Sequence, residues 1–500
     1  MLQLKRVGLH TYGENVVFLS AHCRTYKPKA FASFNKVEVS GAGRSIMATL
    51  NIVENGGLLD PESLGLSISA FDDLGLPEGA QVSLRPATQS RSLEAVRRKI
   101  GGETLSAEEL HAIVRDIAAH RYSKTEITAF VVACSSFMTT KEVMGLTSAM
   151  ADAGTRLRWD TPPCNFSMVV DKHCVGGVPG NRTSMIVVPI VAAYGLPIPK
   201  TSSRAITSPA GTADTMEVLA NVDVSIERMQ DIVHRHRGCL TWGGRVNLSP
   251  ADDIMITVER PLAIDTPEQM VASILSKKIA AGATHLVIDM PVGPTAKVRS
   301  TVEATRLRKL FEYVGAALGL QITVLVTDGT QPVGRGIGPV LEARDVMAVL
   351  RNTSAAPADL KERAILLAGA LLDFDPSLKG GEGAKRARDI LESGKALAAM
   401  EAIMKAQGCP PQPCELGVLV RDVMAPASGV VAAIDCYRIA RIARLAGAPG
   451  SKGAGIDIFH KVGNRVEKGA ALYRIHAAVE TDFGFATAMA EELNGYTIAA

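Results

Sequence analysis

Short apolar runs separated by glycine and proline turns fill the first 88 residues of this 500-residue chain. Helical periodicity is weak there, and the pattern favours strands. The expected strands are Val16–Ser20, Lys36–Val39, Ser45–Val53 and Gln81–Leu84. The sequence therefore predicts a small N-terminal β domain over residues 1–88.

From Ser92 onward the apolar positions follow a helical pattern. Three helix starts carry a capping box, in which a hydroxyl accepts a backbone N–H and a glutamate three residues later accepts the N–H of the cap. The pairs are Ser106 with Glu109, Ser123 with Glu126, and Thr139 with Glu142. We expect a helical domain over residues 89–160 that also receives the segment at about 250–280.

Beyond residue 160, apolar runs of strand length alternate with helical stretches. The expected strands are Phe166–Val170, Leu286–Met290 and Ile322–Thr327, and Met185–Tyr194 is an expected apolar helix. This alternation indicates a mostly parallel sheet, in which ligands bind beyond the carboxyl ends of the strands. It predicts an α/β phosphate-binding domain over residues 161–417.

The last segment, residues 418–500, has glycine-punctuated apolar runs that predict β-hairpins and one helix. Residues 429–475 resemble the hairpins of biotinyl and lipoyl carrier domains. A carrier needs a lysine at an exposed hairpin tip, and none stands between Val430 and Asp435. We therefore expect a C-terminal α+β domain, which makes the whole chain a multidomain α/β protein.

Composition narrows the class of partner. The net charge is only +3, from 54 basic and 51 acidic residues, and aromatic residues make up 4%, so neither a polyanion partner nor a stacking platform for nucleic-acid bases is expected. No apolar run reaches membrane-spanning length, and Met1–Gly8 lack the apolar core of a signal peptide, so a cytoplasmic location is the default. The eight cysteines have neither disulfide-framework nor zinc-like spacing, so we expect reduced thiols and no metal.

The segment Asp171–Ser184 combines glycines, cations, a histidine and hydroxyls between an expected strand and an expected helix. The N–H groups and dipole of a helix N-terminus favour a phosphate there, Lys172 adds a charge, and Gly176 and Gly177 allow close approach of the backbone. A tight turn alone does not need this combination. The spacing is not that of a Walker A motif, and Gly334–Gly338 is not a dinucleotide fingerprint.

A second loop, Lys200–Thr212, is rich in hydroxyls and holds one arginine before another expected helix. Such groups suit phosphate or sugar oxygens. A serine- and threonine-rich turn that only caps the helix explains the same residues equally well.

A third segment runs from Glu259 into a helix that carries Ser273 and Lys277. Residues four apart share one helix face, so this pair could hold a heterocyclic base, although a solvated polar face is the common alternative. Asp265 could donate a proton only if burial raised its pKa. Lys297, beyond an expected strand end, could reach an anion, although a lone lysine is usually just exposed.

Taken in this order, the three segments resemble the thymidine phosphorylase family. The resemblance is closest to its long branch, the type 2 putative thymidine phosphorylases of bacteria and the archaeal AMP phosphorylases. It spans nearly the whole chain, including the N-terminal β extension. The motifs that carry it are Asp171-Lys172-His173, Ser202 to Ser208, Gly211 to Asp214, Ser273 to Lys278, and Val292-Gly293.

The resemblance implies a pentosyltransferase that catalyses reversible phosphorolysis of an N-glycosidic bond. The expected reaction converts thymidine and phosphate to thymine and 2-deoxyribose 1-phosphate. The alternative is an AMP phosphorylase, which would convert a nucleoside 5′-monophosphate to base and ribose 1,5-bisphosphate. A Mg-dependent phosphoribosyltransferase is more distant, because Asp171 is the one carboxylate between Asp160 and Asp214.

The resemblance also implies no cofactor, since inorganic phosphate is a co-substrate, and a homo-oligomer of at least two copies. By position, Lys172, Ser184, Ser203 and Thr212 would bind phosphate. The implied catalytic residues are His173, Asp265 as proton donor to the base, and Lys277. The other implied substrate contacts are Gly177, Arg204, Ala205, Ile206, Thr207, Ser208, Ser273 and Lys297, together with Ser203 and Thr212.

The sequence departs from the shorter members of the family at two points. Cys174 stands where they usually have serine, which replaces a hydroxyl by a weak donor. An additional residue near Pro179-Gly180-Asn181 leaves the choice between Thr183 and Ser184 open.

Overall fold

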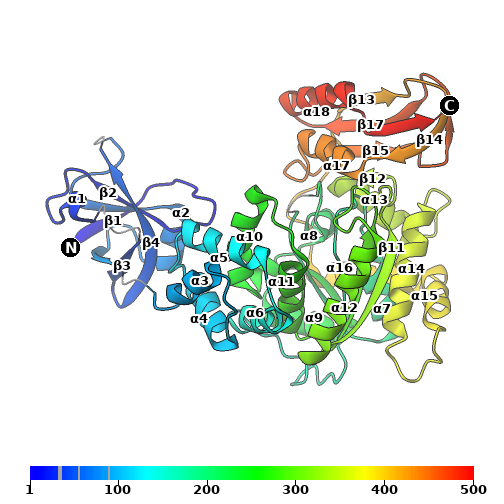
Figure 1. Ribbon diagram of the computed structural model, residues 1–500. Coiled ribbons are helices and arrows are strands. Elements are labelled where there is room, and N and C mark those ends of the chain that lie inside the picture. Colours follow the sequence, from blue (N-terminus) through cyan, green and yellow to red (C-terminus); the bar gives the residue numbers. More distant parts are fainter. Residues whose placement is uncertain (32–35, 55–56, 88–89, 206–207, 500) are drawn as a thin grey trace. The chain divides into compact units, whose positions relative to one another are not determined.

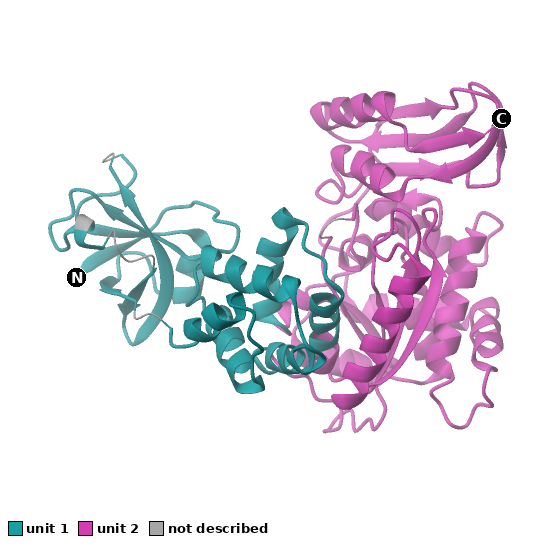
Figure 2. Ribbon diagram, in the orientation of Figure 1, with its two compact units in different colours: residues 1–154, 249–276 teal, residues 155–248, 277–500 magenta. Residues whose placement is uncertain are grey.

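The computed structural model describes residues 1–31, 36–54, 57–87, 90–205 and 208–499. The chain forms two compact units (Figure 2). Unit 1 comprises residues 1–154 and 249–276, and unit 2 comprises residues 155–248 and 277–500. The elements are those of a multidomain α/β protein, as predicted. The division into four domains with the boundaries given above remains a prediction.

Unit 1 begins with a closed barrel in the strand order β1-β5-β2-β4-β3-β6 (Figure 1). All four predicted strands are present, and the pattern missed two short ones that complete the closure. The elements are β1 (Leu2–Arg6), β2 (Val16–Ser20), α1 (Pro28–Phe31), β3 (Lys36–Gly41), β4 (Arg44–Val53), β5 (Ser63–Leu66), α2 (Ile68–Leu74) and β6 (Gln81–Pro86). Buried Leu and Val side chains from these strands fill the barrel.

The rest of unit 1 is helical, as predicted. It consists of α3 (Leu93–Ile100), α4 (Ala107–Ala118), α5 (Lys124–Ser136), α6 (Thr140–Asp152), α10 (Pro250–Leu262) and the N-terminal part of α11 (Pro267–Ala280). All three predicted capping boxes are confirmed, because each hydroxyl and each glutamate makes its bond to the backbone. A buried ion pair, Lys99 Nζ to Glu142 Oε1 at 2.6 Å, joins α3 to α6.

Unit 2 contains a parallel sheet in the order β11-β10-β7 and a parallel pair, β8 with β9. The mostly parallel arrangement predicted from the sequence is confirmed. The strands are β7 (Val170–Cys174), β8 (Ile198–Ser202), β9 (Gly238–Trp242), β10 (His285–Val292) and β11 (Gln321–Asp328). The helices are α7 (Ser184–Tyr194), α8 (Thr212–Met216), α9 (Ile226–His236), α12 (Thr301–Ala317), α13 (Pro339–Leu350), α14 (Ala358–Leu372), α15 (Gly383–Glu392) and α16 (Lys395–Gln407), with a short 3₁₀ helix, η1 (Gly243–Arg245).

The predicted strand Phe166–Val170 is misplaced along the chain, because β7 runs over Val170–Cys174. Asp171 and Lys172 are buried in the sheet opposite Leu286 and Val287 of β10. The apolar pattern marked the run before them instead, since charged residues enter a core only where partners from other elements neutralise them.

The C-terminal segment, residues 418–500, forms two sheets. The first has the order β12-β15-β17-β13, and its strand β12 comes from the α/β part of unit 2 (Figure 1); the second has the order β16-β14-β18. The elements are β12 (Gly336–Ile337), β13 (Leu419–Met424), β14 (Gly429–Ile434), α17 (Cys436–Leu445), β15 (Gly455–Ile458), β16 (Arg465–Val466), β17 (Ala471–Ala477), α18 (Glu480–Glu492) and β18 (Tyr496–Ala499). The prediction of one helix is wrong, because α18 is a second one. Its buried residues are small ones such as Ala486 and Ala490, so it lacks a strong apolar stripe.

No helix within the described ranges is both long and apolar enough to cross a membrane.

Candidate active site

The loop between β7 and α7 is a close-packed turn built on glycines. Gly176, Gly177 and Gly180 have φ values of 99°, 86° and 78°, a region that side chains disfavour. A Cβ at Gly177 would lie 2.4 Å from the backbone nitrogen of Lys297, and one at Gly180 would lie 2.1 Å from the Val333 carbonyl oxygen. The loop is therefore pressed against two other loops of unit 2, and no side chain fits at either position.

Lys172 lies under this loop and is 1% exposed. Its Nζ donates a hydrogen bond to Thr183 Oγ1 at 2.8 Å and lies 3.5 Å from Asp289 Oδ2. Asp289 also accepts hydrogen bonds from Asn181 and from Thr327. The contact partner of Lys172 is thus Thr183, whereas the predicted phosphate ligand Ser184 is the buried first residue of α7.

Asp171, next to Lys172, gathers two more buried lysines. Its Oδ2 lies 2.7 Å from Lys278 Nζ, and its Oδ1 lies 3.6 Å from Lys200 Nζ. Burial lowers the pKa of Lys200 to about 7, although Asp171 opposes the shift. When all three ammonium groups are protonated, they exceed the two carboxylates by one positive charge, which favours an anion.

Lys200 and Lys278 were overlooked in the sequence as site residues. A signal for Lys200 was present, because it directly follows the apolar pair Ile198-Pro199 within a short strand. Lys278 was not assigned to the site, because the four-residue spacing from Ser273 selected its neighbour Lys277 instead.

His173 and Cys174 end β7 as neutral groups. Burial, together with Lys278, Lys200 and Lys172, holds the pKa of His173 well below its ordinary value, so the imidazole is uncharged at neutral pH. Burial raises the pKa of Cys174 to about 12, and its sulfur accepts a hydrogen bond from Asn181 Nδ2 at 3.3 Å. Both side chains therefore offer hydrogen bonds rather than charge to a ligand.

The hydroxyl-rich loop after β8 is closed on Asp214 of α8. Asp214 Oδ2 accepts hydrogen bonds from Ala205 N at 2.7 Å and Gly211 N at 2.9 Å. Ser203 is exposed and Ser208 Oγ donates to the Ala210 carbonyl. The predicted contacts Ile206 and Thr207 lie outside the described residues.

Arg204, a predicted substrate contact, is engaged within the protein. Its guanidinium donates to both carboxylate oxygens of Glu217, at 2.8 and 2.6 Å, and lies 3.2 Å from Asp214 Oδ1. In this structure it ties the loop to α8 rather than leaving the guanidinium open for a ligand.

Thr212, the first residue of α8, connects the two loops. Its Oγ1 accepts a hydrogen bond from Arg182 Nη1 at 3.1 Å, and Arg182 Nε lies 2.6 Å from the buried Glu342 Oε2. Burial raises the pKa of Glu342 to about 7, although Arg182 opposes the shift. Nearby in the chain, Ser202 has a buried hydroxyl oxygen without a hydrogen-bond partner among the described residues. Neither Arg182 nor Ser202 was assigned a role from the sequence.

Unit 2 thus holds all four predicted phosphate residues, and two of them, Lys172 and Thr212, contact residues of the glycine loop. Within the glycine loop, Thr183 contacts Lys172 and Arg182 contacts Thr212. Gly177 of the same loop packs against the backbone of Lys297. Lys297 itself is exposed. Lys277 belongs to this unit as well and is one of the cations that lower the pKa of His173.

Unit 1 holds Asp265 and Ser273. Ser273 and Lys277 are both half-buried on α11, as expected for one helix face, and Ser273 Oγ donates to Asp252 Oδ2 at 2.9 Å. Asp265 lies in the connection between α10 and α11 and is exposed. Unit 1 therefore does not supply the burial that the proton-donor hypothesis requires, and this role remains a prediction.

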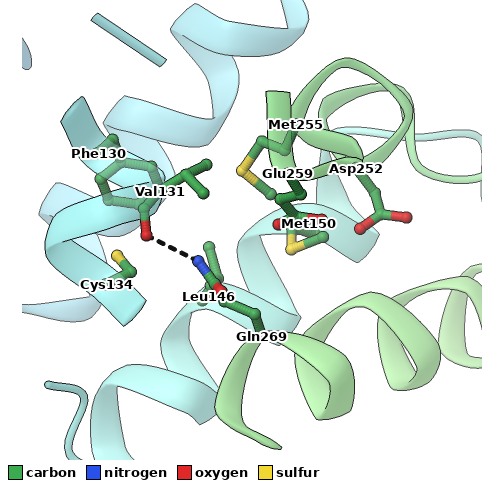
Figure 3. A pocket seen from close by; sticks show the side chains of 9 residues that line it. All are labelled: Phe130, Val131, Cys134, Leu146, Met150, Asp252, Met255, Glu259 and Gln269. Carbon is green, nitrogen blue, oxygen red and sulfur yellow. Dashed lines mark hydrogen bonds between the residues drawn. The ribbon is translucent and has the colours of Figure 1, made fainter. Parts of the chain in front are cut away.

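A small pocket between the helices of unit 1 lies next to Asp252 (Figure 3). Figure 3 shows Gln269 reaching across it, where its Nε2 donates to the Val131 carbonyl oxygen at 2.9 Å. This bond joins the start of α11 to α5. The lining residues are Phe130, Val131, Cys134, Leu146, Met150, Asp252, Met255, Glu259 and Gln269.

Three family models match this chain. Residues 93–154 match the helical bundle domain of the glycosyl transferase family, and residues 167–397 match its a/b domain. Residues 430–498 match the pyrimidine nucleoside phosphorylase C-terminal domain. The matches agree with the predicted fold class.

Curated relatives match over nearly their whole length. A protein of Rhodopseudomonas palustris named "Putative thymidine phosphorylase" is 57% identical, with 99% of this chain and 96% of the relative covered. Proteins of the same name from a Bradyrhizobium species and from Albidiferax ferrireducens are 56% and 55% identical, with 99% of this chain and 97% and 95% of the relatives covered. Among solved structures, anthranilate phosphoribosyltransferase from Thermus thermophilus has a TM-score of 0.51 at 20% identity, covering 63% of this chain and 99% of that one. That likeness shows the fold alone.

Proposed function

Because this chain belongs to the thymidine phosphorylase family of pentosyltransferases, we propose that it catalyses the reversible phosphorolysis of thymidine to thymine and 2-deoxyribose 1-phosphate. The observation that carries the proposal is the buried cluster of Lys172, Lys200 and Lys278 beneath the glycine loop. When all three lysines are protonated, their excess of one positive charge, beside the N-terminus of α7, suits a phosphate that must be both held and oriented for attack.

Cleavage of the N-glycosidic bond develops positive charge on the sugar and negative charge on the base. A phosphate fixed by the lysine cluster and by Thr212 would place its oxygen next to C1′ and stabilise the sugar cation. Neutral His173 would donate or accept a hydrogen bond at the sugar or base, and Lys277 would stabilise the departing base. The roles proposed for Ser184, Ser203, Ser273 and Asp265 rest on the family resemblance.

The first test incubates the protein with phosphate and a panel of nucleosides and nucleoside 5′-monophosphates, with free base and sugar phosphate followed by chromatography. We expect thymine from thymidine only when phosphate is present. Release from 5′-monophosphates alone would refute thymidine as the substrate. Phosphate-independent release, or none from any compound, would overturn the phosphorylase assignment.

An AMP phosphorylase is a second candidate, favoured by the position of Lys297. A Cβ at Gly176 would lie 3.8 Å from Lys297 Cδ and 3.9 Å from Cε, so this exposed lysine runs along the glycine loop. An ammonium there suits the 5′-phosphate of a nucleotide, which would bind in addition to the inorganic phosphate. In that case Lys297→Ala would weaken turnover of 5′-monophosphates and leave thymidine turnover unchanged.

We further propose that the enzyme is cytoplasmic, works as a homo-oligomer of at least two copies, and needs no cofactor besides its co-substrate phosphate. Light scattering measures the mass of the particle in solution and so tests the proposed homo-oligomer. Activity that survives dialysis against EDTA would support the cofactor-free reaction, whereas activity restored only by Mg²⁺ would favour the phosphoribosyltransferase alternative.

A further inference from the structure

Lys452, in the C-terminal segment between α17 and β15, reaches the α/β part of unit 2. Its Nζ lies 2.9 Å from Glu217 Oε2 and 3.3 Å from Asp214 Oδ1. Asp214 lies in the first turn of α8, and Glu217 directly follows its last residue. A side chain far along the chain is therefore bonded to the carboxylates beneath the hydroxyl-rich loop.

These carboxylates bind the described residues of that loop on both sides of residues 206 and 207. Asp214 Oδ2 binds the N–H groups of Ala205 and Gly211, at the two ends of the loop, and Arg204 binds both carboxylates. A Cβ at Gly211 would lie 2.7 Å from backbone atoms of the Ser203–Ala205 stretch, so the two ends of the loop touch. Any shift of Asp214 would move both ends together.

Within the cluster formed by Asp214, Glu217, Arg204 and Lys452, the charges balance only if Lys452 is counted. Asp214 and Glu217 contribute two negative charges, and Arg204 contributes one positive charge. The hydrogen bond from Arg204, together with Lys452, lowers the pKa of Glu217 to about 2 despite its partial burial, so the Glu217 carboxylate is ionised at neutral pH. Without Lys452, a net negative charge would remain beside the loop that carries Ser203 and Thr212.

Lys452 itself is held firmly in place. Its carbonyl oxygen accepts a hydrogen bond from Val340 N at 3.1 Å, at the start of α13. β15 pairs with β12, and a Cβ at Gly338 would lie 2.3 Å from the Ala454 carbonyl oxygen, so the backbones are in direct contact. The ammonium is therefore presented by a backbone that is packed against the α/β part.

Two further contacts from the C-terminal segment reach loops that touch the glycine loop. Cys436 N donates to Thr295 Oγ1, two residues before Lys297. Lys461 Nζ donates to the carbonyl of Pro332, and the next residue, Val333, donates its N–H to the Pro179 carbonyl at 3.1 Å. The segment thus contacts three loops around the predicted phosphate site.

We propose that Lys452 is a positioning residue for phosphate binding: it fixes the hydroxyl-rich loop through Asp214 and Glu217 and cancels their excess negative charge. This inference rests on the proposed function, because it assumes that the phosphate of the reaction binds beside this loop. A residue acting through others in this way changes binding by about tenfold rather than abolishing it.

The test compares Lys452→Met with Lys468→Met, which removes the same charge from an exposed turn of the same segment. KM for phosphate is measured at saturating nucleoside, and KM for nucleoside at saturating phosphate. We expect Lys452→Met to raise KM for phosphate about tenfold and to change KM for nucleoside by less than about twofold. Lys452→Arg should restore the wild-type value, because it keeps the charge.

A double variant, Lys452→Met with Glu217→Gln, separates charge from folding. It removes one charge of each sign, so it should recover much of the phosphate affinity lost in Lys452→Met if the excess negative charge is responsible. Thermal unfolding of each variant shows whether the protein is folded. An unchanged phosphate KM in folded Lys452→Met, an equal rise in both KM values, or the same effect in Lys468→Met would overturn the inference.

Direct titration of inorganic phosphate by calorimetry keeps the two proposals apart. If the wild-type protein releases no base from any nucleoside or nucleotide, the proposed function fails, whereas weaker phosphate binding by Lys452→Met would still support the inference. If the wild type is active and both proteins bind phosphate equally, only the inference fails.

Discussion

Replacement of Lys172 by methionine tests the buried charge arrangement most directly. Methionine keeps most of the volume of the lysine stem, so the main change is loss of the ammonium next to Asp289. Asp289 is fully buried, and its carboxylate would then lack a cationic partner at 3.5 Å. Breaking a buried pair in this way costs about 3–5 kcal/mol. Since Asp289 keeps its hydrogen bonds from Asn181 and Thr327, we expect a loss of about 3 kcal/mol at neutral pH.

The pH dependence has a defined sign. Burial raises the pKa of Asp289, but Lys172 and the hydrogen bonds outweigh it, so the folded-state pKa lies below the ordinary value. A depressed aspartate pKa contributes stability that is present above the unfolded pKa and is lost as pH falls through the folded pKa. Lys172 is the largest of the lowering causes, so the pKa of Asp289 should rise when Lys172 is replaced. The stability difference between variant and wild type should therefore shrink as pH falls below about 4.

The assay is urea unfolding followed by tryptophan fluorescence. Both tryptophans, Trp159 and Trp242, belong to unit 2, so the signal reports on the unit that contains Lys172. The double variant Lys172→Met with Asp289→Asn removes both charges and should be more stable than Lys172→Met alone. Phosphate-dependent base release should fall about 100-fold in the single variant. A stability loss below about 1 kcal/mol, or a double variant no more stable than the single one, would refute the reasoning.

Three further outcomes follow from the glycine loop and the residues before it. Gly177→Ala should lower the free energy of unfolding by about 2–4 kcal/mol, because the new Cβ would lie 2.4 Å from a backbone nitrogen. Gly195 also has a positive φ but open space around it, so Gly195→Ala should lower the free energy of unfolding by only about 1–2 kcal/mol. Urea unfolding of both variants measures the difference. The folded-state pKa of His173 is depressed, so at mildly acidic pH the unfolded chain binds a proton that the folded chain does not. The free energy of unfolding of the wild type should therefore fall by about 1 kcal/mol between neutral pH and about pH 5.5. The fall should be smaller in His173→Gln, and an equal fall in both proteins would contradict this. At mildly alkaline pH, iodoacetamide should modify exposed Cys409 well before half-buried Cys174, whose thiol pKa is raised to about 12. Peptide mass spectrometry gives the order of modification, and faster labelling of Cys174 would disprove the argument.

The local features of this protein were readable from its sequence. The three capping boxes are correct because both of their bonds form within three residues, so no distant element can change them. The strands β2 and β10 were found because their apolar runs are buried in the ordinary way. Strand β11 was found from the length of its apolar run, although most of its side chains are partly or fully exposed. The glycine loop stood out because its combination of residue types has few purely structural explanations.

The charged core of the site depended on the tertiary structure. Asp171 and Lys172 were assigned to a loop, because no pattern marks a charged residue as buried until its partners are known. Those partners, Lys200, Lys278 and Asp289, come from three other elements. The contact between Lys452 and Asp214 joins residues 238 positions apart. Spacing along a chain reports only local bonds, whereas the balance of buried charges is a property of the packed fold, and the fold alone decided which residues share this site.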